Sequence, residues 1–498
     1  MSVNTYEKNM NELFWKRITK LFGYSNTMKS NNEELTDFFI PFEEDILLVE
    51  DKSRDKEFQI AEGLNVYTKK EEGKEEDYSN LIKDWINVCT SKIGKATKQL
   101  NGAEVYLKNK GKVYKNRKKI KDNEILYNEK ARVHKIILLH NIDKASCQYF
   151  DTQYGGPIYS DLVENVNGRF QVKPGVPEEN LIFAYNSVEN LHILSEQQFK
   201  FLISYLPTLK DLLDYFNWKE ELLKNNKYGI FTIDEYSLVC YYIEYGNRLL
   251  EKLGKIGEKE SNLINIVLEL YNDEDIVKLE NTHPSFIKYR SSANCINNLL
   301  HYLEDNKDMA DSENELKDRL MKFYLKLNIE QQLSLTEEIP KLLNMSYKKT
   351  FVKVLSFYLD GCLYIFSNFD KRIEGEDTGN KYIEAVLFKY VITYIDKFQD
   401  KIDIKDIIIC AMHQRDDGTI RDIYASINIE ENMKNIDYFR EVVSSVDAFL
   451  PKKVEENLYS IYNLFNPLKK ISVKGRDRNK PCPCGSGLKY KKCCGKNI

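Results

Sequence analysis

The first hydrophobic pattern of the chain has the spacing of a helix. Over residues 8–22, apolar side chains such as Phe14, Ile18 and Leu21 recur three or four positions apart, and Gly23 ends the pattern. Such spacing places the side chains on one face of a helix, and glycine commonly follows a helix end. We therefore predict a first helix over residues 8–22.

Two apolar runs follow, separated by a short acidic segment. Residues 35–42 and 46–52 have the composition of strands, and Glu43, Glu44 and Asp45 lie between them. Apolar runs joined by a few polar residues are typical of a β-hairpin. The second run ends in charge, at Glu50, Asp51 and Lys52.

A helix and a strand complete this part of the chain. After an acidic stretch at residues 68–77, helical spacing runs from Leu81 to about Leu107, and residues 133–139 form an apolar, strand-like run. The order helix, hairpin, helix, strand predicts an α/β domain over residues 1–145.

The remaining chain is expected to be mostly helical. Residues 146–233 read as an α/β extension with a strand at 181–184 and helices at 196–206 and 209–216. We predict a predominantly helical domain over 234–468, with paired strands near its end at 407–412 and 420–429. The helices expected there are Glu235–Leu253, Asn262–Tyr271, Phe286–Leu303, Glu313–Leu327 and Tyr382–Phe398.

Composition places the chain among ordinary soluble proteins. It has 498 residues, 42% hydrophobic and 30% charged, with a formal net charge of −4. We find no apolar signal segment at the start and no run of 18 or more apolar residues, so no membrane span is expected and a cytoplasmic location is predicted.

The charged residues of the hairpin suggest metal-dependent chemistry. Glu50 and Lys52 share one face of a strand, and hairpin pairing would bring Asp37 close to them. Two carboxylates can share a divalent cation such as Mg²⁺ or Mn²⁺, and a neighbouring lysine can orient or deprotonate a water. These groups suit hydrolysis of a phosphodiester. The alternative is that these charged side chains are only solvated at the end of a strand.

This stretch resembles the PD-(D/E)xK nuclease superfamily, in which an acid on one strand precedes (D/E)-x-K on the next. The resemblance covers about residues 8–145 and implies a nuclease-like core in which Asp37, Glu50 and Lys52 are catalytic, supported by Gln99 on the following helix. Residues 34–37, 49–53 and 98–103 together also look like a group of bacterial nuclease-like proteins. Relatives in that group often carry the acid directly before the lysine, which leaves Asp51 as an alternative to Glu50 for the metal.

A basic run follows the second helix and could bind nucleic acid. Lysines and Arg117 recur between 108 and 121, with Tyr106 and Tyr114 interleaved. Such side chains can neutralise phosphates and stack on bases, although an exposed basic loop without a ligand is the alternative. Glu12 on the first helix is a further candidate metal ligand, although a solvated glutamate on a helix face is the simpler explanation.

The C-terminal tail, residues 469–498, carries two pairs of cysteines. Cys482 and Cys484 are separated by one residue, and after eight more residues Cys493 and Cys494 are adjacent. Four thiolates form a closed tetrahedral site of the structural zinc type. The tail is also basic, with ten Lys and Arg residues against one acid.

This tail resembles the SEC-C motif, the C-terminal zinc motif of SecA. The resemblance covers about twenty residues and implies a small zinc knuckle that docks onto a protein partner or contacts nucleic acid. The chain lacks the G-x-x-x-x-G-K-[S/T] phosphate loop of an ATPase, since Gly94-Lys95-Ala96-Thr97 does not have the required spacing.

The other cysteines and the histidines are expected to be structural. Six cysteines are scattered singly beside apolar residues and read as core thiols, and six histidines have no obvious ligand partner nearby in the sequence. The leading hypothesis is a metal-dependent nuclease, and the alternative is a non-catalytic adaptor or nucleic-acid-binding protein. The single cysteines are Cys89, Cys147, Cys240, Cys295, Cys362 and Cys410, and the histidines are His134, His140, His192, His283, His301 and His413.

Overall fold

The chain folds into two compact units of mixed α/β structure in the computed structural model. The first comprises Met1–Asp308 with Asp318–Ser334, and the second Met309–Lys317 with Leu335–Ile498. The residues that the structure describes are 14–31, 33–52, 94–115, 123–139, 163–166, 169–172, 187–188, 190–223, 228–231, 235–249, 264–267, 271, 273–305, 311–343, 354–368, 376–414, 420–446, 450–451 and 453–465.

An eight-stranded sheet forms the centre of the first unit, in the order β5-β4-β1-β2-β3-β6-β10-β9. Strands β1, β2 and β3 are antiparallel neighbours, whereas β3, β6 and β10 run parallel. The strands are β1 (Tyr24–Lys29), β2 (Glu34–Phe42), β3 (Asp45–Lys52), β4 (Val113–Tyr114), β5 (Glu124–Ile125), β6 (Arg132–Leu139), β9 (Ser187–Val188) and β10 (Leu191–Ser195).

The predicted hairpin is confirmed, and its register is regular. Phe38 lies opposite Val49 and Phe42 opposite Asp45, so the turn consists of Glu43 and Glu44. Glu43 has a φ of 53°, the left-handed conformation that a two-residue hairpin turn requires.

Helix α4 (Gly94–Lys108) covers one face of the sheet. It joins β3 to the parallel strand β6, and its buried side chains are small or aliphatic: Ala96, Leu100, Ala103 and Leu107. Lys135 on β6 is 5% exposed and bonds to Asn101 at 2.8 Å and Glu104 at 2.7 Å. These contacts attach the helix to the sheet.

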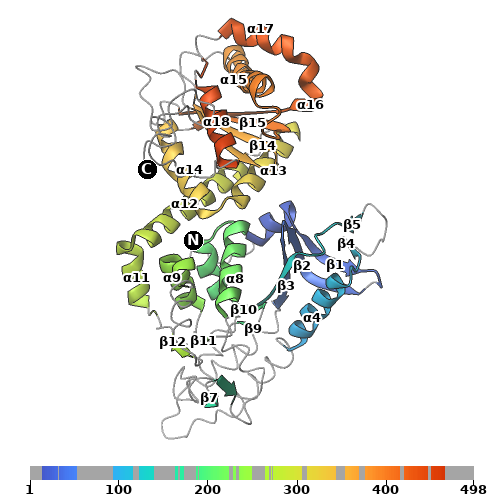
Figure 1. Ribbon diagram of the computed structural model, residues 1–498, viewed down its shortest axis with the longest axis vertical. Helices are drawn as coiled ribbons and strands as arrows, with labels where there is room; N and C mark the ends of the chain where they lie inside the picture. Colours follow the sequence, from blue (N-terminus) through green and yellow to red (C-terminus); the bar gives the residue numbers. More distant parts are fainter. Residues whose placement is uncertain are drawn as a thin grey trace, which may run out of the picture. The chain divides into compact units, whose positions relative to one another are not determined.

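The other face is covered by the helix at 14–21 together with α7 (Glu196–Tyr205) and α8 (Leu209–Leu223). Trp15 stacks between Phe38 of β2 and Phe199 of α7, at ring distances of 5.6 and 5.1 Å. Figure 1 shows α4 and α8 on opposite sides of strands β2 and β3. Gly23 ends the first helix as predicted, and an added Cβ there would lie 2.7 Å from the Ile40 side chain.

Further helices of the first unit pack beyond α8, and two small sheets are described as well. Parallel β11 pairs with β12, and antiparallel β7 pairs with β8. The elements are α9 (Glu235–Tyr245), α11 (Asp273–Thr282), α12 (Pro284–Asp305), β7 (Val163–Val166), β8 (Arg169–Val172), β11 (Tyr228–Phe231) and β12 (Ile264–Val267); α13 (Asp311–Lys326) and α14 (Ile329–Leu343) each belong partly to both units.

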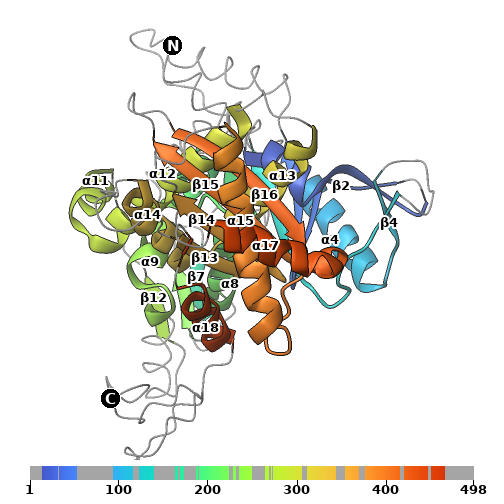
Figure 2. The ribbon, with the colours of Figure 1, turned by 90° about the horizontal axis from the view of Figure 1, so that it is seen from above.

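The second unit is built on a four-stranded sheet in the order β13-β14-β15-β16. The central pair β14–β15 is parallel, and both outer pairs are antiparallel. Helix α15 (Glu376–Lys397) packs on this sheet and α17 on α15, as Figure 2 shows. The remaining elements are β13 (Val354–Leu359), β14 (Cys362–Asn368), β15 (Asp406–Gln414), β16 (Ile420–Asn428), α16 (Ile429–Asn432), α17 (Ile436–Val446) and α18 (Val454–Phe465).

Three expectations about organisation differ from this fold. The sheet does not end at residue 145, because β10 pairs with β6 from beyond that boundary. The region 234–468 contains more strands than expected, because β13 and β14 join the two predicted strands, β15 and β16, in a four-stranded sheet. The helix expected over 262–271 is wrong, since residues 264–267 pair as strand β12. A short apolar run does not distinguish strand from helix by itself.

Candidate functional site

The hairpin brings the three predicted catalytic side chains together. Because Phe38 lies opposite Val49, Asp37 on β2 is one step further along the pair, opposite Glu50 on β3. Directly opposed residues of a strand pair share a face, and Lys52 shares it with Glu50. The Lys52 Nζ lies 3.4 Å from Asp37 Oδ2 and also forms an ion pair with Glu50 Oε2.

The Asp37 carboxylate is held by the strand opposite it. Its Oδ2 accepts a hydrogen bond of 2.8 Å from the backbone amide of Asp51. Thr36, the residue before Asp37, donates its hydroxyl to the backbone carbonyl of Val49 at 2.7 Å. These two bonds fix the end of the hairpin where the ladder itself stops, so the position of Asp37 is defined by β3.

Glu50 is the buried member of the cluster. Its side chain is fully buried, whereas those of Lys52 and Asp37 are 21% and 27% exposed. Burial raises the pKa of Glu50 to about 7; the Lys52 hydrogen bond opposes this change, and the negative charge of Asp37 adds to it. For Lys52, burial lowers the pKa, but bonding to Glu50 outweighs burial and raises the pKa above its usual value.

A divalent cation fits this donor set. Within the part of the chain that the structure describes, Glu50 Oε1 is buried and has no hydrogen-bond partner. A buried carboxylate oxygen without a donor costs free energy, and Mg²⁺ and Mn²⁺ prefer carboxylate oxygens as ligands. Asp37 supplies a second carboxylate at the exposed edge of the same cluster.

Asp51 and Gln99 are placed differently from the other candidates. Side chains alternate along a strand, so the Asp51 carboxylate points away from the face shared by Glu50 and Lys52, and Asp51 contributes through its amide. Gln99 lies half-buried on the sheet-facing side of α4. A crossover helix runs opposite to the strands it joins, so Gln99 is displaced from Asn101 toward the strand ends that carry Glu50. No contact between Gln99 and the cluster is found among the described residues.

The basic run after α4 is largely engaged with acidic neighbours where the structure describes it. Lys108, Lys110 and Lys112 are exposed. Their ammonium groups lie 2.7, 2.7 and 3.1 Å from the carboxylates of Glu104, Glu129 and Glu124. Arg117, Lys118, Lys119 and Lys121 are outside the described residues, as is Glu12.

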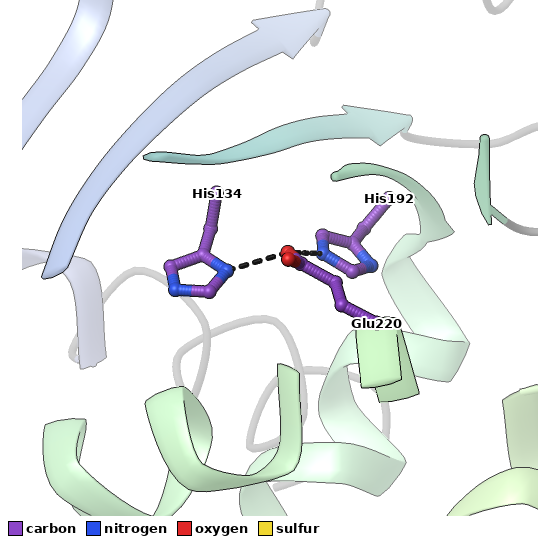
Figure 3. A group of neighbouring side chains, drawn as sticks. All are labelled: His134, His192 and Glu220. Carbon is purple, nitrogen blue, oxygen red and sulfur yellow. Dashed lines mark hydrogen bonds and ion pairs between the residues drawn. The ribbon is translucent and has the colours of Figure 1, made fainter. Parts of the chain in front are cut away.

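A second polar cluster, which we did not predict, lies on the opposite face of the sheet. His134 on β6, His192 on β10 and Glu220 on α8 are all buried. Figure 3 shows the Glu220 carboxylate between the two imidazole rings. Its Oε1 lies 2.6 Å from His134 Nδ1 and 3.1 Å from His192 Nε2. The expectation that these two histidines lack ligand partners is therefore wrong.

Asp45, at the start of β3, extends this cluster. Its Oδ1 lies 3.2 Å from His134 Nε2 and 2.9 Å from Nε of Arg132. Burial lowers the pKa of His134, but its hydrogen bonds to Asp45 and Glu220 outweigh burial and raise the pKa overall. Burial instead dominates for His192, whose pKa falls to about 3. No spacing rule in the sequence links three residues so far apart.

The remaining site predictions concern cysteines. Cys240, Cys362 and Cys410 are buried and Cys295 is half-buried, and none of these four described cysteines forms a disulfide. Cys89, Cys147 and the four cysteines of the tail lie outside the described residues.

A comparison with protein families identifies the tail. Residues 478–496 match the SEC-C motif, and this segment contains Cys482, Cys484, Cys493 and Cys494. The motif is in general a zinc-binding one, which supports the predicted structural zinc. The match covers the tail alone and does not assign the rest of the chain to a family.

The chain is also similar over short segments to protein translocase subunit SecA of several bacteria. It is 46% identical to that of Desulforamulus reducens over 59 residues, 12% of this chain and 6% of the relative. It is 30% identical to that of Desulforudis audaxviator over 132 residues, 22% of this chain and 13% of the relative. It is 76% identical to that of Trichlorobacter lovleyi over 25 residues, 5% of this chain and 3% of the relative. The chain thus spans less than a sixth of the length of these relatives. No solved structure matches the chain significantly.

Among the helices that the structure describes, none combines the length and apolar composition needed to span a bilayer.

Proposed function

We propose that the chain is a metal-dependent phosphodiester hydrolase that cuts DNA or RNA at a site formed by Asp37, Glu50 and Lys52. The observation that carries the proposal is the convergence of two carboxylates and one ammonium group at the end of β3, with the buried Glu50 Oε1 lacking a partner among the described residues. Such an oxygen suits a cation ligand better than a structural ion pair, in which we expect both oxygens to be bonded.

Each residue of the proposed site has a different role. Asp37 and Glu50 would hold the cation, and the Asp51 amide keeps Asp37 in place. With a cation on Glu50, the Lys52 ammonium would no longer pair with that carboxylate, and its protons would be available to the substrate. The Lys52 ammonium would then donate to a phosphate oxygen and offset the negative charge that develops there in the transition state.

Bound Mg²⁺ or Mn²⁺ would lower the pKa of a coordinated water and offset negative charge on the phosphate. In the reaction, the oxygen of a water molecule adds to phosphorus, one P–O ester bond breaks, and one proton of that water ends on the leaving oxygen. The products are a phosphate monoester and a hydroxyl group, and no other reactant is needed.

The zinc tail is proposed to recruit the enzyme. A four-cysteine zinc knuckle is too small to carry chemistry of its own, and its basic residues suit an acidic protein surface or nucleic acid. The short similarity to SecA supports a docking role for the tail and has no bearing on the hairpin site.

The direct test is cleavage by the purified full-length chain. Single- and double-stranded DNA and RNA are incubated with the wild type and with Lys52→Ala, each with Mg²⁺, with Mn²⁺ or with EDTA. Lys288→Ala is the matched control, because it removes an exposed lysine on α12. We expect cation-dependent cleavage by the wild type and by the control only.

Absence of cleavage by a folded wild type with either cation would overturn the proposal. It would favour the alternative, a non-catalytic adaptor or nucleic-acid-binding protein that docks through the SEC-C motif. Cleavage that persists equally in Lys52→Ala would show that the hairpin is not the active site.

A further inference from the structure

The buried cluster of His134, His192 and Glu220 has the composition of a zinc site. Two imidazole nitrogens and a carboxylate oxygen are among the ligands that zinc binds most often. The three ligand atoms lie within 4.8 Å of one another, and it is the one such group found in the part of the chain that the structure describes. It is separate from the hairpin site, because His134 and Glu50 lie on opposite faces of the sheet.

The separations between ligand atoms are compatible with one ion. At zinc–ligand distances of about 2.0–2.1 Å, neighbouring atoms of a tetrahedral site lie roughly 3.3 Å apart. The His192–Glu220 separation of 3.1 Å is close to this value, and the His134–Glu220 separation of 2.6 Å is shorter. A bound ion would therefore push Glu220 Oε1 back from His134 Nδ1.

Asp45 lies where a supporting group is expected. A histidine that binds a metal through one nitrogen usually donates its other N–H to a carboxylate or a carbonyl, which fixes the ring and makes it a stronger ligand. Asp45 Oδ1 lies 3.2 Å from His134 Nε2, leaving Nδ1 directed at Glu220. Arg132 holds the same carboxylate from outside at 2.9 Å.

The rings are already positioned by the surrounding core. Phe216 stacks on His192 at a ring distance of 4.3 Å and lies 6.2 Å from His134. Both histidines are fully buried. A site this enclosed suits an ion taken up during folding, because solvent does not reach it afterwards.

We propose that His134 Nδ1, His192 Nε2 and Glu220 Oε1 bind one buried zinc ion. The ion would join β6, β10 and α8 on the face of the sheet opposite the hairpin site. It is distinct from the zinc of the cysteine tail and does not depend on nuclease activity.

The test counts zinc in the full-length chain. A variant with Cys482, Cys484, Cys493 and Cys494 all changed to serine removes the tail site, and its metal content is measured after refolding in micromolar zinc and dialysis against zinc-free buffer. We expect about two zinc ions per wild-type chain and one per tail variant. Adding His192→Ala to the tail variant lowers the content to near zero, whereas adding His301→Ala, which removes a half-exposed histidine on α12, leaves one.

Spectroscopy keeps the test valid should His192→Ala fail to fold. The tail variant is refolded with Co²⁺, and its X-ray absorption is expected to show nitrogen and oxygen ligands without sulfur. A tail variant that unfolds cooperatively yet holds less than about a tenth of a zinc ion would overturn the proposal. The cluster would then be a hydrogen-bonded network in which the two histidines share protons with the acids.

Discussion

The Lys52 ammonium lies 3.4 Å from the Asp37 carboxylate on the neighbouring strand, although fourteen residues separate the two in the chain. The same ammonium bonds to Glu50. Without a cation, Lys52 therefore occupies the space between the two acids. The proposed chemistry depends on replacing that single charge by a divalent ion, and the predictions for the hairpin follow from this exchange.

Changing Lys52 should affect catalysis more than stability. We expect Lys52→Ala to lower kcat by about 10²–10³-fold, the usual effect of removing one donor that stabilises charge in the transition state. Lys52→Arg keeps the charge and should retain more activity than Lys52→Ala. Single-turnover cleavage rates at saturating Mg²⁺ measure this. A loss seen only in KM would place Lys52 in substrate binding instead.

Cation binding at Glu50 should depend on pH. Its pKa is raised to about 7, so below pH 7 a proton competes with the cation for the carboxylate. The apparent Mg²⁺ affinity should fall about tenfold for each pH unit below 7 and level off above it. Calorimetric titration at pH 6 and pH 8 measures this, and Glu50→Gln should abolish the dependence together with most of the affinity.

The same shift affects stability in the absence of the cation. Because the folded-state pKa of Glu50 is above its unfolded value, this group contributes stability that is fully present below about pH 4.5 and is lost as the pH rises through 7. Added Mg²⁺ should therefore raise the melting temperature at pH 8 and have little effect at pH 5.5. Equal stabilisation at both values would argue against a role for Glu50 in cation binding.

Asp211 offers a pH test that is independent of the hairpin. This carboxyl is buried on α8, where burial raises its pKa to about 7 against the hydrogen bonds from Gln332 and Thr208. Above pH 7 the Asp211 carboxyl is ionised, so the folded protein carries a negative charge in its core. The unfolded carboxyl ionises near its usual pKa of 3.8, so the cost of burying it grows from about pH 4 and stops growing above pH 7. Between pH 5.5 and pH 8 we expect the stability of Asp211→Asn relative to the wild type to rise by about 2 kcal/mol, since one pKa unit corresponds to about 1.4 kcal/mol.

Urea unfolding at the two pH values measures the effect of Asp211→Asn. Asp214→Asn is the matched control, because Asp214 lies on the same helix and is 35% exposed. The prediction would be contradicted by a stability difference between Asp211→Asn and the wild type that does not rise with pH. An equal rise for Asp214→Asn would contradict it as well.

Loss of zinc from the tail should change the tail itself and leave the stability of the rest of the chain nearly unchanged. Changing Cys493 to serine removes one of four thiolates, so the Co²⁺-substituted chain should lose most of its sulfur-to-metal charge-transfer absorption. The main unfolding transition should shift by less than about 0.5 kcal/mol, because residues 478–496 form a separate short motif. A large shift would mean that the tail packs on one of the folded units.

The hairpin could be predicted from sequence because its information is local. Apolar runs on both sides of an acidic segment define the two strands, although the sequence suggested a turn of three residues, 43–45, whereas Asp45 already belongs to β3. The two-residue turn fixes the register, and that register brings Asp37 beside Glu50 and Lys52. Strand β1 escaped prediction because residues 24–29 are mostly polar, with only Thr27 and Met28 buried. Its strand conformation depends on pairing with β2, which a single-sequence pattern does not contain.

The buried cluster could not be predicted for a related reason. His134 and His192 are neighbours only because β10 pairs in parallel with β6 after a long connection, and Glu220 reaches them only because α8 packs on that face. Each residue alone reads as an ordinary core or surface position. The role of Gln99 stays a prediction, because the residue lies on α4 but no contact between it and the hairpin cluster is found among the described residues.

The two-residue turn at Glu43 and Glu44 limits how this chain can change during evolution. Adding or deleting one residue between Phe42 and Asp45 would shift the strand pairing by a single step and turn one acid toward the opposite side of the sheet. The length of this loop should therefore be more constrained than its composition, apart from residues that tolerate the positive φ of Glu43. Insertions that many surface loops accept would here separate Asp37 from Glu50.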